Sequence, residues 1–97
     1  MSPAEVLEAL VGLCREAGLE VRRVRGSPEA PGEPPARSAL CRVRGAHWLV
    51  LSDADDAEER IEAAADALRR LAPEIAEERY LPPAVRARIA ARGAVSS

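Results

Sequence analysis

The chain is 97 residues long with a formal net charge of −2. This fits one small domain spanning residues 1–97 and argues against a general nucleic-acid binder, since such domains usually carry a strong basic excess. Phe is absent, the aromatic residues are Trp48 and Tyr80, and 21 Leu, Val and Ile residues must build the core. A core this thin favours self-association. No apolar stretch approaches the roughly 20 residues that cross a bilayer, so we expect no membrane span.

The first expected element is a helix over residues 3–17. Ser2, Pro3 and Glu5 have the order of a capping box, and Gly18 suits a left-handed helix end. Residues 19–25 then predict a strand. Its alternation shifts by one position at its end, which a bulge or a frayed strand end would explain.

A hairpin is expected after a long loop. Residues 26–37 contain four prolines and two glycines and predict that Pro/Gly-rich loop. Strands over residues 38–44 and 46–52 follow, joined by a tight turn at Gly45. The last strand is apolar on both faces, which predicts a central strand covered on both sides, at least in part. In the strand before it, the alternation predicts that the helices cover the face bearing Ala39, Cys41 and Val43.

Helices complete the chain. Asp53, Asp55 or Asp56 can cap a helix that Pro73 ends or extends over residues 75–78, and Pro82-Pro83 starts a last helix before a flexible tail at residues 93–97. We therefore expect an α+β fold of order α-β-β-β-α-α, a three-stranded antiparallel sheet with helices packed on one face.

The soft metal ligands of the chain are His47, Cys14 and Cys41. Zinc sites usually bring their ligands in closely spaced pairs, and a fourth ligand here would be a carboxylate or water. A hairpin-edge histidine and two buried thiols are the simpler interpretation. We expect no metal, no other cofactor and no catalytic residue. The two thiols and the acidic N-terminus, which does not resemble a signal peptide, favour the cytoplasm.

Charge is distributed in blocks along the chain. Residues 22–44 are basic, residues 53–66 are acidic and residues 79–92 are basic again. The strand arginines could bind phosphate or RNA, or could be solvated edge residues or partners of the acidic helix. All basic residues are Arg, which indicates a GC-rich bacterial genome. The possible anion-binding set is Arg22, Arg23, Arg25, Arg42 and Arg44.

The segment from Ser38 to Leu71 resembles the core of the ImmA/IrrE-type metallopeptidases. Its pieces are SALCRVRGAHWLVLS for the hairpin, DADDAEERIEA for the acidic loop, and AADALRRL for the helix that carries H-E-x-x-H in that family. Asp66 and Arg70 fall on the two zinc histidines and Ala67 on the catalytic glutamate. The resemblance thus implies a metallopeptidase-like scaffold that has lost its zinc and its peptidase chemistry.

These patterns predict a non-catalytic protein-interaction or regulatory module with an unidentified protein partner. Anion or nucleic-acid binding through the strand arginines is the alternative, and an unfamiliar enzyme using Cys41 and His47 is a third. We also expect a homodimer at micromolar concentration, through an open edge strand or a sheet-face interface, unless residues 80–92 fold back over that face. The possible interface residues are Leu40, Trp48 and Leu49.

Overall fold

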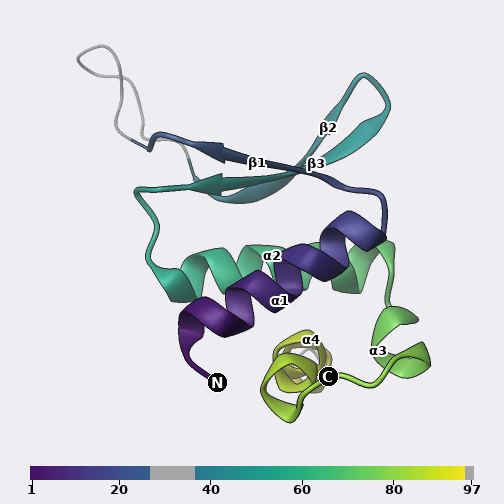
Figure 1. Ribbon diagram of the computed structural model, residues 1–97. Coiled ribbons are helices and arrows are strands. Elements are labelled where there is room, and N and C mark those ends of the chain that lie inside the picture. The colour runs from purple at the N-terminus through teal and green to yellow at the C-terminus, as the bar shows by residue number, and fades with distance from the viewer. Residues whose placement is uncertain (27–36, 96–97) are drawn as a thin grey trace.

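The computed structural model describes residues 1–26 and 37–95, with side chains described up to residue 90. Figure 1 shows the sheet as one layer, α1 and α2 as a second layer against one of its faces, and α3 and α4 beyond them. Most of the predicted loop at residues 26–37 falls outside the described residues. The elements in chain order are α1 (Pro3–Glu16), β1 (Glu20–Val24), β2 (Ala39–Val43), β3 (Ala46–Ser52), α2 (Ala57–Leu71), α3 (Ile75–Glu78) and α4 (Pro83–Val95). The α+β class is confirmed, but the short helix α3 is separate, so within the described residues three helices and not the expected two follow the sheet.

β3 is the central strand, as predicted, but the sheet is mixed and not antiparallel. The strand order is β1-β3-β2; β2 pairs antiparallel with β3, and β1 pairs parallel with it. The predicted antiparallel meander is therefore wrong. β1 ends and β2 begins at the same end of the sheet. The sequence between them is long enough to reach the far edge, which leaves a position between the two strands for β3.

The helices cover the face of the sheet opposite to the predicted one. The side chains that pack in the core beneath them include Val21, Leu40, Leu49 and Leu51. The prediction for β2 is wrong because its register with β3 places Leu40 opposite Leu49, on the side that the helices cover. By alternation and register, the other face bears Glu20, Arg22, Val24, Ala39, Cys41, Val43, Ala46, Trp48 and Val50. We call this set the open face, since the described helices all lie on the other side (Figure 1).

β1 contains no bulge, which was one of the two expected explanations for its shifted alternation, and it ends at Val24, one residue before its predicted end. Arg23 stays in register with Leu51 and Val24 with Ser52. The alternation of apolar and charged residues shifts along β1 because both faces of the strand carry a valine. Val21 packs against the helices, and Val24 lies on the open face.

Both long helices near the sheet begin at capping boxes. Ser2 and Glu5 cap α1 reciprocally, and Asp56 with Glu59 does the same for α2. The structure thus confirms the first cap and selects Asp56 among the three candidates for the second. In the part of the chain that the structure describes, no helix is long and apolar enough to cross a membrane.

α4 packs on the helical layer and not on the sheet. It contacts α2 and α1; Arg88 donates two hydrogen bonds of 2.6 Å to Glu58, and Arg69 donates to the carbonyl oxygen of Arg88 at 2.8 Å. The segment from residue 80 therefore leaves the sheet uncovered. α4 also continues through Gly93 to Val95, past its predicted end, because a glycine weakens a helix by about 1 kcal/mol without stopping it.

A cluster of serines and aspartates joins the chain at the end of the sheet where β1 stops and β2 starts. Asp53 accepts a hydrogen bond from the Gly26 amide at 2.6 Å, and Asp55 accepts one from the Ser38 amide at 2.7 Å. The Ser38 hydroxyl in turn accepts from the Ser52 amide at 2.9 Å. We call these five residues the strand-end cluster; it fixes both ends of the long connection to the segment after β3.

Gly26 is expected to be intolerant of any side chain. A Cβ there would overlap the Ala54 methyl group and would lie 2.6 Å from the Ser52 hydroxyl oxygen. Gly26→Ala should therefore lower the free energy of unfolding by about 1–3 kcal/mol, measured by urea denaturation. Gly12→Ala is the matched control: Gly12 lies within α1 with open space around it, so an alanine should stabilise by about 0.5–1 kcal/mol. Equal effects of the two substitutions would contradict the close approach at Gly26.

Candidate functional site

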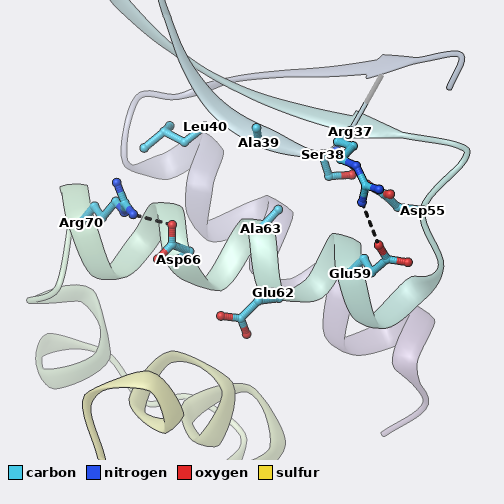
Figure 2. A pocket seen from close by; sticks show the side chains of 10 residues that line it. All are labelled: Arg37, Ser38, Ala39, Leu40, Asp55, Glu59, Glu62, Ala63, Asp66 and Arg70. Carbon is cyan, nitrogen blue, oxygen red and sulfur yellow. Dashed lines mark hydrogen bonds and ion pairs between the residues drawn. The ribbon is translucent and has the colours of Figure 1, made fainter. Parts of the chain in front are cut away.

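A groove of about 470 Å³ runs between β2 and α2. The start of β2 forms one wall, and one side of α2 forms the other (Figure 2). β2 is an edge strand, so this groove follows the free edge of the sheet. The lining residues are Arg37, Ser38, Ala39, Leu40, Asp55, Glu59, Glu62, Ala63, Asp66 and Arg70.

Carboxylates outnumber cations along the groove. Four acids and two arginines line it, which gives a formal charge of −2 at neutral pH. Arg70 pairs with Asp66 at 2.9 Å, and Arg37 lies 3.9 Å from Glu59, as the dashed lines in Figure 2 mark. Arg69, from the adjacent side of α2, lies 2.7 Å from Glu62 and 3.6 Å from Asp66, so the four acids exceed the arginines that contact them by one. The groove therefore presents oxygen acceptors that are only partly neutralised, and it favours a cationic ligand.

The backbone of β2 offers hydrogen-bonding groups to this edge. The two-residue turn at Arg44 and Gly45 has positive φ at both positions, 50° and 83°, which is typical of a type I′ hairpin. In such a hairpin the two residues that flank the turn exchange hydrogen bonds, and so does every second pair after them. Val43, Cys41 and Ala39 therefore bond to β3, which agrees with the Ser52 amide of β3 pointing toward β2. The amide and carbonyl groups of Leu40 and Arg42 consequently point outward, where a further strand could pair.

The polar side chains of the groove are carboxylates, arginines and the Ser38 hydroxyl. Its lining includes neither Cys nor His, and among the described residues no group of three or more His, Cys, Asp or Glu side chains could hold a metal ion. The two positions that the resemblance aligns with zinc histidines, Asp66 and Arg70, lie in the groove and pair with each other. Ala67 is fully buried.

Comparisons with known proteins give no match. No family model, no curated protein and no solved structure is similar to the chain. Function must therefore be argued from the geometry of this chain itself.

The structure does not bring the strand arginines together. β1 and β2 lie at opposite edges of the sheet, so Arg22 and Arg23 are separated from Arg42 by β3. Arg22 lies on the open face, Arg23 and Arg42 alternate to the helical side, Arg44 lies in the hairpin turn, and Arg25 follows β1. These residues are exposed, but they form no common anion site.

The three expected interface residues lie on different faces. Leu49 is fully buried and Leu40 packs against the core, so the expectation that they form a surface patch is wrong. They are buried because the helices cover their side of the sheet. Trp48 lies half-buried on the open face, where the Arg22 guanidinium carbon sits 4.9 Å from its ring centre.

His47, Cys14 and Cys41 do not converge either. Cys14 is buried in α1 and donates to the Ala64 carbonyl at 3.7 Å, and burial raises the pKa of its thiol to about 11. Cys41 lies on the open face, across the sheet from Cys14, and His47 alternates to the helical side. A raised pKa leaves Cys14 protonated at neutral pH and poorly nucleophilic.

The sequence of α2 contains a periodic signal for its wall of the groove. Glu59, Glu62, Asp66 and Arg70 recur at intervals of three or four residues, so they form one polar stripe beside the apolar one. In the sequence alone these acids belong to the acidic block of residues 53–66. Nothing in the sequence places this stripe beside β2, because that requires the tertiary arrangement.

Asp55 should make the stability of the fold depend on acid pH. Hydrogen bonds, first from the Ser38 backbone and then from its side chain, hold the pKa of Asp55 below its ordinary value of 3.8. A carboxyl whose pKa is lowered by folding contributes stability above its unfolded pKa, and that contribution is lost as the pH falls through the folded pKa. Asp55→Asn should therefore lower the urea midpoint at pH 7, and the deficit should shrink below about pH 4. Glu77→Gln, on the surface of α3, is the control, and a deficit that stays constant with pH would contradict this role.

Proposed function

We propose that the protein is a non-catalytic protein-interaction module that binds an extended, cation-bearing segment of a partner protein. The segment would add to the sheet as a strand next to β2. The observation that carries this proposal is the groove along the free edge of β2, with outward backbone groups on one wall and surplus carboxylates on the other. Strand addition of this kind draws affinity from backbone hydrogen bonds and specificity from alternate side chains.

The geometry defines how such a segment would lie. It would pair with the outward amide and carbonyl groups of Leu40 and Arg42 along a strand of five residues, about 17 Å in length. Every second side chain would then point toward α2, where Glu62 and Asp66 favour Lys or Arg. The remaining side chains would point to the side of the open face and extend its apolar surface.

The absence of catalysis is part of the same proposal. Peptidase chemistry of the family that the sequence resembles needs two imidazoles and a carboxylate at positions that Asp66, Arg70 and Ala67 occupy. On this view the chain keeps a metallopeptidase-like scaffold and uses the cleft to hold a segment without cutting it.

The cytoplasm is the proposed location. Cys14 and Cys41 are both free thiols, and they lie on opposite sides of the sheet. A structure that pairs neither of them within the chain suits a reducing compartment. Anion binding by the strand arginines remains the less favoured alternative, because those arginines are divided between two edges.

A selection from a phage-displayed library of random linear peptides tests the proposal. The enriched peptides should carry Lys or Arg at alternating positions, and their affinities can be measured by fluorescence polarisation. Arg42→Pro removes an outward amide at the edge without removing a bond to β3, so it should weaken binding about tenfold or more, whereas Arg42→Ala should not. The absence of any enriched peptide, or equal binding by the two variants, would contradict strand addition.

Ala63 tests the preference for cations separately from the shape of the groove. Ala63→Arg and Ala63→Glu add side chains of similar length to the same wall, with opposite charges. The arginine should weaken binding of an enriched cationic peptide more than the glutamate does, and the difference should diminish at high salt. If both weaken binding equally at every salt concentration, the charge of the groove does not select the ligand.

A further inference from the structure

The second free edge of the sheet is formed by β1. The Asp53 amide donates to the Val24 carbonyl at 3.0 Å, so the backbone carbonyl of Val24 points toward β3. In a parallel pair, alternate residues of a strand turn both backbone groups to the same neighbour, so Arg22 and Glu20 also bond to β3. The amide and carbonyl groups of Val21 and Arg23 therefore point outward, away from the sheet.

The side chains of β1 give this edge a distinctive charge pattern. The strand reads Glu-Val-Arg-Arg-Val over Glu20–Val24. Glu20 and Arg22 share the open face and form an ion pair of 3.2 Å, with both side chains about half exposed, and Arg22 also lies over Trp48. An exposed pair of this kind contributes little to the stability of the monomer, so its partners can be exchanged at low cost.

We infer that β1 is a homodimerisation edge, on which a second copy of the chain pairs its own β1 antiparallel about a twofold axis at Val21. In this register the outward backbone groups of Val21 exchange hydrogen bonds with those of the partner's Val21. Glu20 then lies opposite the partner's Arg22, and Arg22 lies opposite the partner's Glu20. Each strand is thus complementary in charge to its own copy.

The neighbouring registers are excluded by the same charges. A twofold axis at Arg22 places that arginine directly opposite the partner's Arg22 on the open face. An axis at Arg23 places Arg23 opposite the partner's Arg23. Like charges directly opposite in an antiparallel pair destabilise it, so the register at Val21 is selected. The outward direction of the Val21 backbone groups, which follows from the pairing with β3, independently permits this register.

The dimer would contain one continuous six-stranded sheet with an open face shared by both subunits. Twofold pairing uses β1 of each subunit and leaves each β2 free, so assembly ends at the dimer. The inference is independent of the proposed peptide site, which lies at the opposite edge. Pairing of short edge strands buries little surface, which fits association at micromolar concentration.

Sedimentation equilibrium of charge-exchanged variants tests the inference. Relative to the wild-type dimer, Glu20→Arg and Arg22→Glu should each weaken dimerisation about tenfold or more, because symmetry replaces two attractive pairs with two repulsive ones. The double exchange should restore the dimer by recreating both attractive pairs. A wild-type mass that stays near 10.4 kDa up to about a hundred micromolar, or a double variant no better than the single ones, would overturn the inference.

Proline variants keep the test decisive if a charge exchange disturbs folding. Arg23→Pro removes an outward amide of β1 and should abolish the dimer, while Arg23→Ala should keep it. Circular dichroism confirms that each variant is folded. Arg42→Pro, at the other edge, should leave the dimer intact, which separates failure of dimerisation from failure of peptide binding. A dimer that survives Arg23→Pro, or that Arg42→Pro abolishes, would exclude β1 as the interface.

Discussion

The central position of β3 is the constraint on which the rest of the structure depends. This strand is the longest of the three, and it pairs with a strand along each of its two edges. The helical layer covers the side that bears Leu49 and Leu51, both of which are buried. β1 and β2 occupy the flanks, and each is left with one unpaired edge. The helices beneath this sheet, the two free edges and the open face all follow from that placement.

Local signals in the sequence predicted most of the elements and little of their arrangement. Capping residues such as Ser2 and a turn glycine such as Gly45 act within a few positions of the chain, and they located α1 and the hairpin. The parallel pairing of β1 was not predictable, because a connection as long as residues 26–37 permits either edge and either direction. The buried face of β2 was not predictable from its own alternation, because the wholly apolar set Ala39, Cys41 and Val43 lies on the open face. The helical side carries Arg42 beside Leu40, and only the register with β3 reveals that Leu40 is packed there.

The candidate site shows the same division between local and tertiary information. The sequence revealed the acids of α2, and helical periodicity places Glu62 and Asp66 on one stripe. Their role as one wall of a groove depends on β2 lying beside them, which the strand-end cluster helps to fix through Ser38 and Asp55. The strand arginines show the converse: they are adjacent in an antiparallel meander and divided by β3 in the actual sheet.

Residue-resolved hydrogen exchange of backbone amides, measured by NMR on the Arg22→Glu variant to keep the chain monomeric, tests most directly whether both edges of the sheet are open. The account predicts fast exchange at Leu40 and Arg42 on β2 and at Val21 and Arg23 on β1. It predicts slow exchange at Cys41 and at position 22, the interposed residues whose amides bond to β3. Equal protection of all residues along either strand in the monomer would show that its edge is already covered, and would contradict the account.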